Sequence, residues 1–457
     1  MKIIKQINNM NCKALMHVKK LAGAIGLLLF AFFTTTAQTR TLSLNEAVQL
    51  GVQNSKQLKR SQYKINEALA RLDQSKDAYL PSATVGFQYL HALMMTRTVN
   101  IPGLTDAGKP LKLPFDFPAY LGTLAVSEPI FKGNQLKYAR QSADLMVQLS
   151  RLDADKDKED ITYLIISSYI NYNKILQNQQ IVTQNMQDVQ SKLDEIVKYE
   201  GQGLATQNDV LRFRLQKSQI QLTQIELENN RRIANFNMNI MLGLPDSTTI
   251  QLPEPSYRLD EHPVFADFLQ QAEANRRELQ ELGYQDKLAG INIKKIQDQR
   301  LPTVSANVGA YYINPTGKPI PTGHTVLAPV TLGVGASWDI ATLYTNKNKV
   351  REATIQKQSL SNDREDAMDQ IKKDVNQYYI GYLQALERIK VLQDAVTQAA
   401  ENERIMESKF RNNLATTTDR IDAQTLIYQS RVNLELAKSD ATIAYYDLLR
   451  STGHIQP

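Results

Sequence analysis

The sequence predicts an α+β membrane protein, in which duplicated strand–long helix–helix repeats form a trimeric 12-stranded transmembrane β-barrel continuous with a periplasmic α-helical coiled-coil barrel. Three observations predict this class. The second half of the 457-residue chain repeats the first half. Each copy contains a very long stretch with a heptad seam of apolar residues. Each copy also contains two short segments in which apolar residues alternate with small or polar ones, as in strands with one apolar face.

The start of the chain is typical of an exported protein. Basic residues precede an apolar run at Leu21–Phe33, and small residues up to Ala37 form a cleavage pattern before Gln38. As a helix this run would be too short for a hydrocarbon core of ~30 Å. We therefore interpret residues 1–37 as a signal peptide, the alternative being a membrane anchor that is retained.

The composition argues against several classes of protein. The chain has 53 Lys plus Arg against 47 Asp plus Glu, but five of the lysines precede Gln38. The mature chain is therefore nearly neutral and lacks the clustered positive charge that nucleic-acid binding requires. The only cysteine, Cys12, also lies in the signal peptide, and the histidines are isolated. With no recognisable catalytic or phosphate-binding motif, we expect no enzyme activity, no cofactor and no metal site.

Comparison of the sequence with itself defines the organisation of the chain. At an offset of 210, matches run in order from Lys137 and Lys347 to Gly243 and Gly453, and upstream the offset becomes 221. Matches in this order indicate a duplication. We expect a first structural repeat over residues 38–243, a connector over 244–263 and a second structural repeat over 264–457.

Helical hairpins are expected at about 134–242 and about 345–450. Apolar residues of each long first helix recur at alternating spacings of four and three, which indicates a coiled coil rather than an ordinary amphipathic helix. Continuous medium helices are expected at Leu44–Ala78 and Val264–Asp298. The seam positions are Ile161, Ile165, Ser168, Tyr172, Ile175, Gln179, Val182, Met186, Val189, Leu193 and Ile196 in the first copy, and Ile371, Val375, Tyr378, Tyr382, Ala385, Ile389, Leu392, Val396, Ala399, Glu403 and Met406 in the second.

Strands are expected at about 82–92, 119–128, 303–313 and 329–339. In the last of these, Val330, Leu332 and Val334 alternate with threonine and glycine. Strands of this length and pattern suit a barrel that crosses a bilayer and has a wet interior. Taken alone, the pattern also fits a soluble, half-buried sheet. The export signal, the absence of cysteine from the mature chain and the aromatic residues near the strand ends favour the membrane.

Four strands cannot close a barrel. An open sheet edge within lipid leaves unpaired backbone groups that cost several kcal/mol each, so several chains must supply the wall. Two chains would give eight strands and an interior filled by side chains, whereas three give twelve strands and a water-filled interior. We therefore expect a homotrimer.

Several local motifs occur in both copies, in the same order. Tyr79–Ser82 and Arg300–Thr303 precede the first strand of each copy, and Val126–Phe131 leads into the first long helix. The most specific motifs are the helical turns at Gly203–Leu211 and Asn413–Ile421. With these motifs, essentially the whole mature chain resembles the TolC-type outer-membrane efflux protein family, the outer membrane factor of tripartite efflux pumps.

This resemblance implies an outer-membrane channel of a tripartite efflux or type I secretion system, located in the cell outer membrane and extending into the periplasm. The implied partners are two further copies of the chain, a periplasmic adaptor (membrane fusion) protein, an inner-membrane pump of the RND, ABC or MFS type, and outer-membrane lipid. Two alternatives are a passive outer-membrane porin, which would not need helices of ~100 Å, and a secreted structural coiled-coil protein, which would not need detergent for extraction.

Candidate functional residues lie at the two helical turns. A glycine or asparagine at the first position can adopt the left-handed conformation that reverses the chain, and the threonines can cap the helices that follow. The resemblance implies that the turns are the free periplasmic tips that contact the adaptor. The expected contact residues are Gly203, Leu204, Ala205, Thr206, Asn413, Leu414, Ala415 and Thr416.

Asp419 and Asp422 lie one helical turn apart, just after the second turn. Either could simply interact with the helix dipole. In a trimer they would place six carboxylates around one aperture, and the resemblance implies that they form the periplasmic constriction, or gate. Mutual repulsion would then raise their pKa values, and their charge would favour cations. In the first copy Asp209 is equivalent to Asp419, but Arg212 replaces the second acid.

The chain departs from the family at two positions near the second turn. Where some members have a tyrosine and an arginine that close the channel, this chain has Phe410 and Ala415. Since neither side chain can form those bonds, we expect other bonds to close the resting channel.

Overall fold

The computed structural model describes residues 39–93, 98–99, 111–112, 116–253, 259–260, 262–315 and 326–455. The expected signal peptide, residues 1–37, lies outside these ranges. The chain forms two compact units. One unit combines residues up to Leu58 with Asp157–Asn275 and the residues from Ile371 onwards, and the other combines Lys59–Lys156 with Arg276–Gln370. Each unit therefore contains residues from both halves of the sequence.

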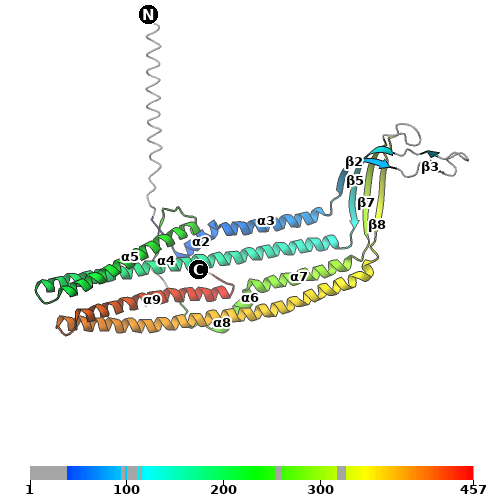
Figure 1. The fold of residues 1–457 in the computed structure, drawn as a ribbon. Helices are drawn as coiled ribbons and strands as arrows, with labels where there is room; N and C mark the ends of the chain where they lie inside the picture. The colour runs from blue at the N-terminus through cyan, green and yellow to red at the C-terminus, as the bar shows by residue number, and fades with distance from the viewer. Residues whose placement is uncertain are drawn as a thin grey trace, which may run out of the picture. The chain divides into compact units, whose positions relative to one another are not determined.

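The unit that contains Lys59–Lys156 carries a four-stranded antiparallel sheet (Figure 1). Its strands are β2 (Ser82–Leu93), β5 (Asp116–Phe131), β7 (Thr303–Pro315) and β8 (Val330–Ser337), in the order β2-β5-β7-β8. The two halves of the sequence meet in the β5–β7 pair, whereas β2 and β8 form the two edges. Both edges therefore present backbone groups that no strand of this sheet satisfies.

The register separates two chemically different faces of the sheet. One cross-strand row is Val85, Leu124, Ala310 and Val330, and the next row, on the opposite face, is Thr84, Ala125, Gly309 and Thr331. Because neighbours in register point to the same side, one face is apolar and the other is small and polar. The apolar face is open to the surroundings, with Val85 82% and Leu332 83% exposed.

β5 is longer than the strand expected at 119–128, which was wrong at both ends. Prolines cannot donate to a ladder, so they are unusual within a strand. Pro118 and Pro129 nevertheless lie within β5. At Pro118 the partner is β2 alone, and at Pro129 it is β7 alone, next to a bulge. Each proline therefore lies where β5 has only one neighbour, which is where a sheet tolerates proline.

The link between β2 and β5 contains two further short strands. β3 (Thr98–Val99) and β4 (Leu111–Lys112) pair in antiparallel fashion. β7 ends two residues later than the expected 303–313, and β8 is shorter than the expected 329–339.

Four helices adjoin the sheet: α3 (Lys56–Asp77), α4 (Gln135–Gly201), α7 (Arg277–Asp298) and α8 (Thr342–Arg411). Side chains fix the junctions between helices and strands. Asn134 donates to the Asp298 carboxylate from its backbone N–H (3.1 Å) and its amide (2.7 Å). Asn346 is buried and donates to the carbonyl of Ile296 (2.9 Å).

The medium helices expected at Leu44–Ala78 and Val264–Asp298 are each broken into two. α2 (Leu44–Asn54) precedes α3, and α6 (Phe265–Asn275) precedes α7. Ser55 has an extended ψ of 120°, and its hydroxyl accepts the N–H of Leu58 at 3.2 Å. The expectation was wrong because Ser55 ends one helix and caps the next. At the second break Arg276 has a ψ of 126° and no side-chain cap.

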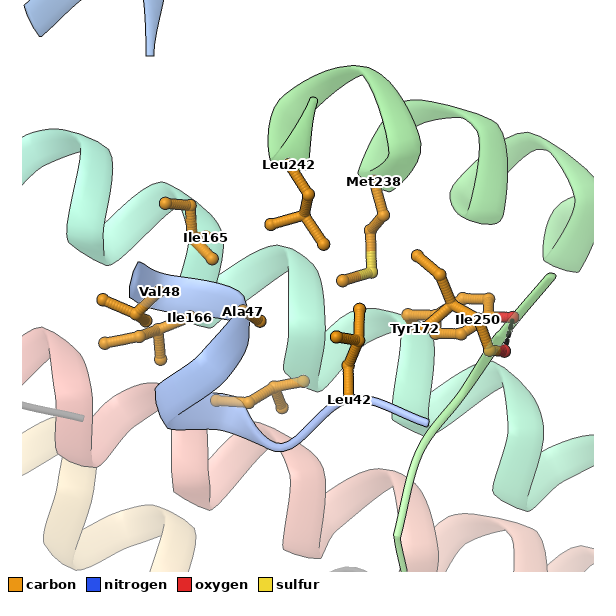
Figure 2. Packing of buried hydrophobic residues seen from close by; sticks show 10 residues of the cluster. Leu42, Ala47, Val48, Ile165, Ile166, Tyr172, Met238, Leu242 and Ile250 are labelled. Carbon is orange, nitrogen blue, oxygen red and sulfur yellow. Dashed lines mark hydrogen bonds between the residues drawn. The ribbon is translucent and has the colours of Figure 1, made fainter. Parts of the chain in front are cut away.

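The other unit is built around an apolar core (Figure 2). β1 (Thr39–Thr41) pairs in parallel with β6 (Thr249–Gln251), a strand within the expected connector. Tyr169 donates to the carbonyl of Leu42 (3.0 Å), and Tyr172 donates to that of Ile250 (2.9 Å). These bonds join α4 to β6 and to Leu42, the residue that follows β1. The fully buried core side chains are Leu42, Ala47, Ile165, Ile166, Tyr172, Leu242 and, at 1% exposure, Ile250.

The long helices pair with α5 (Gln207–Leu242) and α9 (Thr417–Ser451). All of the expected seam positions are buried or partly buried except Tyr378, which is 38% exposed. Among the helices of the described residues, none combines the length and apolar character that crossing a membrane as a helix requires.

Candidate functional site at the helical turns

The two helical turns have the same backbone design. Gly203 has a φ of +73°, and the N–H of Leu204 donates to the carbonyl of Tyr199 (2.8 Å). Asn413 has a φ of +59°, and the N–H of Leu414 donates to the carbonyl of Lys409 (2.8 Å). Within the described residues, Asn413 is the one non-glycine residue with positive φ. These are the left-handed helix ends that the sequence predicts.

The turns present one apolar side chain each to the surroundings. Leu204 is 70% exposed and Leu414 is 76% exposed. Ala205 and Ala415, which were expected to be exposed with the leucines, are partly buried instead. Ala205 packs against the apolar cluster formed by α4 and α5. The apolar contact surface of each tip is therefore essentially a single leucine.

The helices that follow the two turns, α5 and α9, each begin with a capping box. Thr206 accepts the N–H of Asp209 (3.2 Å), and the Asp209 carboxylate accepts the N–H of Thr206 (2.9 Å). Thr416 and Asp419 repeat this arrangement at 3.2 Å and 2.8 Å. Two otherwise unpaired N–H groups are satisfied at each helix start. Asp419 therefore has a structural role, which Asp422 does not share.

The capping bonds of Asp419 determine its electrostatics within one chain. Hydrogen bonds from the backbone and side chain of Thr416 hold the pKa of the Asp419 carboxyl below its ordinary value. The expectation of a raised pKa concerns the six carboxylates of a trimer and stays a prediction, whereas within one chain these hydrogen bonds prevail. For Asp209 burial raises the pKa, but the hydrogen bonds from Thr206 outweigh it and the net shift is downward. Asp422 is exposed on the first turns of α9.

A buried ionic cluster, which sequence reasoning missed, lies close to the second turn. The side chain of Arg420 is only 3% exposed. Its guanidinium donates to both carboxylate oxygens of Glu407 (2.7 and 2.9 Å) and to Glu195 (2.5 Å). Burial raises the pKa of Glu407, but the bonds and charge of Arg420 outweigh it, so that this pKa lies below its ordinary value. The cluster therefore ties α4, α8 and α9 together.

Aromatic and amide side chains extend this cluster. The Phe410 ring lies 4.6 Å from the Arg420 guanidinium carbon and stacks on Tyr199 at 6.4 Å. Phe410 thus has a role that needs no hydroxyl, because the face of its ring contacts the cation. Lys192 pairs with Glu403 (2.7 Å) and also donates to Gln424.

The sequence does contain a signal for the burial of Arg420. Ala423, Gln424 and Ile427 are buried on the same face of α9, and Arg420 continues their spacing by one turn. A charged residue at such a position needs a partner, because burying an unpaired charge is costly.

A side-chain hydrogen bond joins the start of α5 to the start of α9. Arg212, which replaces the second acid in the first repeat, donates to the hydroxyl of Thr418 at 2.8 Å. The structure therefore brings the residues after the two turns together. None of the described residues forms a cluster of three or more His, Cys, Asp or Glu side chains that could hold a metal ion.

The comparisons with known proteins agree with this geometry. Residues 268–454 match the model of the family described as "Outer membrane efflux protein". No curated protein matches the sequence significantly. Among solved structures, the outer membrane protein VceC of Vibrio cholerae is similar over 90% of this chain and 96% of its own, with a TM-score of 0.67 and 14% identity.

Other solved structures share the fold to the same degree. CusC gives a TM-score of 0.69 at 14% identity, covering 90% of this chain and 92% of its own. The CmeC outer membrane channel of Campylobacter jejuni gives 0.68 at 13% identity, covering 90% and 85%.

The match to the outer membrane efflux protein family, together with an open sheet with one apolar face and a pair of long helical hairpins, supports an efflux-type channel of the outer membrane. The chain therefore matches the outer membrane efflux protein family in its second repeat and shares the fold of solved outer-membrane proteins over nine-tenths of its length. It is located in the outer membrane and extends into the periplasm. The family and these neighbours are channels rather than enzymes.

Proposed function

We propose that three copies of this chain form the outer-membrane channel of a tripartite efflux pump or type I secretion system. The observation that carries this proposal is the four-stranded sheet, which has two unpaired edges and one fully open apolar face. A sheet with free edges is not stable in lipid. Closure by further copies of the chain satisfies the edges and leaves the apolar face for lipid.

The strand order favours closure between identical chains. β2 and β8 run antiparallel to each other, because three antiparallel pairings separate them. The β8 edge of one chain can therefore pair with the β2 edge of the next in the antiparallel manner of known membrane barrels. Three chains give twelve strands, and barrels wider than eight strands hold water.

The duplication supports two structural repeats, at 38–243 and 264–457, with a connector between them. Both repeats have a long helix, a left-handed turn and a capping box at equivalent positions. In the proposed assembly each chain contributes both of its helical turns to the periplasmic end of the channel.

The exposed leucines of the tips support a docking role. Leu204 and Leu414 lie on capped, rigid turns and are far more exposed than leucine normally is. We infer that Gly203–Thr206 and Asn413–Thr416 contact a periplasmic adaptor, which connects the channel to an inner-membrane pump of the RND, ABC or MFS type. A passive porin would have no such partner. A secreted structural coiled coil would have no use for the apolar face of the sheet.

The aspartates beside the second turn would form the gate. In a trimer Asp419 and Asp422 contribute six carboxylates near the periplasmic aperture, where they favour cations. Phe410 and Ala415 cannot form the bonds that close the channel in some family members. In this proposal the bonds of the Arg420 cluster take their place, because they hold α8 and α9 against α4.

Conductance in planar bilayers tests both the channel and the gate. The purified protein is expected to conduct with a preference for cations, and the double substitution Asp419→Asn with Asp422→Asn is expected to lower the cation-to-anion permeability ratio by at least about twofold. Asparagine keeps an oxygen that can accept the capping bond from Thr416, so the helix start is retained.

Asp209→Asn is the matched control, because Asp209 occupies the equivalent capping box at the start of α5 and has Arg212 in place of a second acid. We expect a smaller change from it. Protein that inserts into the bilayer but does not conduct ions would contradict the proposal that the chain forms a channel. Unchanged ion selectivity of the double variant would show that Asp419 and Asp422 are not part of the gate.

A further inference from the structure

We propose that a groove directly beneath the sheet binds the phosphate headgroup of an anionic membrane phospholipid. The groove has a volume of about 960 Å³ and is lined by α3, α4, α7 and α8 within one unit. Its lining residues belong to the unit that contains neither the turns nor the Arg420 cluster. Nothing in the proposed channel function requires a site at this position.

The groove has an excess of positive charge. Six of its lining side chains are basic and two, Asp144 and Asp286, are acidic. Asp286 is already paired with Lys357 at 3.3 Å. Lys76 is paired with Asp73 outside the groove at 2.6 Å. The remaining basic side chains of the lining are Lys137, Arg140, Lys287 and Lys294.

Three of these cations make no ion pair, even with Asp144 of the same lining, and lie at the end of the groove nearest the sheet. Lys137, Arg140 and Lys294 form no ion pair with any described residue, whereas Lys287 lies over the ring of Tyr284 at 5.1 Å. Lys137 and Arg140 are in the first two turns of α4, and Lys294 is in the last two turns of α7. At a rise of 1.5 Å per residue, each is within about 10 Å of the end of its helix at the sheet.

The lining also has an apolar component, which distinguishes between kinds of anion. Leu72, Leu145 and Ile291 line the groove together with the ring of Tyr79. A free, fully hydrated phosphate gains nothing from apolar side chains. A phosphate that carries acyl chains can use both components, because its headgroup meets the cations while the start of its chains contacts the apolar surface.

The position of the groove favours lipid from the membrane itself. Tyr79, Trp338 and Tyr344 are exposed where the helices join the strands, and exposed aromatic residues mark the interfacial level of membrane barrels. The lipid phosphates of the periplasmic leaflet lie at that level. Clustered lysine and arginine next to a membrane attract anionic headgroups. The lining residues all come from one chain, and the proposal rests on the proposed function only in placing the sheet in the membrane.

Native mass spectrometry of the detergent-solubilised full-length protein, titrated with phosphatidylglycerol and with phosphatidylcholine, tests this site. The wild type is expected to bind phosphatidylglycerol at least about tenfold more tightly. The triple substitution Lys137→Gln, Arg140→Gln and Lys294→Gln is expected to abolish that preference. The matched control is Lys347→Gln, Lys349→Gln and Arg351→Gln, which removes three exposed cations near the start of α8 but outside the groove, and it should keep the preference.

Two further experiments distinguish a lipid from a soluble phosphate ligand and provide a test that does not depend on the folding of the triple variant. sn-Glycerol 3-phosphate is expected not to displace the lipid, and displacement at equal concentration would overturn the proposal in favour of a soluble phosphate ligand. Should the triple variant not fold, Lys294→Glu alone is expected to weaken phosphatidylglycerol binding, and Lys294→Arg to retain it. Unchanged binding by the folded triple variant, or an equal loss in the α8 control, would overturn the site.

Discussion

Arg420→Ala is expected to destabilise the protein by about 3–5 kcal/mol, the usual cost of removing one partner from a buried ion pair. The substitution would leave the Glu407 and Glu195 carboxylates facing each other without the guanidinium that now binds both. The ring of Phe410 would also lose its cation. Since these residues come from three helices, we expect the region of the second turn to loosen first.

The chain provides a closely matched control for this substitution. Arg411 pairs with the same carboxylate, that of Glu407, at 3.0 Å, but its own side chain is 67% exposed. Exposed ion pairs contribute about 0–1 kcal/mol, so Arg411→Ala should change stability very little. Thermal unfolding followed by the fluorescence of the intrinsic tyrosines measures both variants. Equal effects of the two substitutions would show that the buried cluster contributes no more than a surface pair.

Leu332→Lys is expected to prevent stable insertion of the sheet into the membrane. Leu332 lies in β8 on the apolar face, in register with Val308 of β7. A lysine on the lipid-facing side of a membrane barrel costs about 2–4 kcal/mol near the midplane. Because each chain of a trimer carries the substitution, the cost applies three times to one assembly.

Thr331→Lys tests the assignment of the two faces, because Thr331 precedes Leu332 and lies on the opposite face of the same strand. We expect this variant to insert normally, since its side chain points to the wet interior. The amount of each variant in the outer-membrane fraction, relative to wild type, is the measurement. Equal tolerance of both lysines would contradict the assignment of lipid-facing and interior faces.

Periodicity was sufficient to predict the two faces of the sheet and the seams of the long helices. That Val85, Leu124, Ala310 and Val330 lie on the apolar faces of their strands follows from simple alternation, because the side-chain period of a strand is two. The register that places them in one row is seen only in the structure. The pairing of β1 with β6 could not be predicted in this way. Each strand has three residues, which is too short to show a period. The break at Ser55 was also missed, since a serine within an apolar pattern is compatible with a continuous helix.

The turns were predictable because their chemistry is local. Thr416 and Asp419 lie three residues apart, and this spacing alone indicates a capping box. The Arg420 cluster is different in kind. Glu195 is 225 positions away from Arg420 in the sequence, so no local pattern connects them. The spacing of Arg420 from Ala423, Gln424 and Ile427 indicates that it is buried, but only the packing of three helices shows which carboxylates pair with it.

The molecular mass of the detergent-solubilised particle tests the central claim most directly. The claim is that one chain supplies a third of the wall, because the sheet edges formed by β2 and β8 find their partners only in neighbouring copies. Light scattering coupled to size exclusion, corrected for bound detergent, should give the mass of three chains, and removal of detergent should cause aggregation. A homogeneous single chain that remains soluble without any amphiphile would contradict the account.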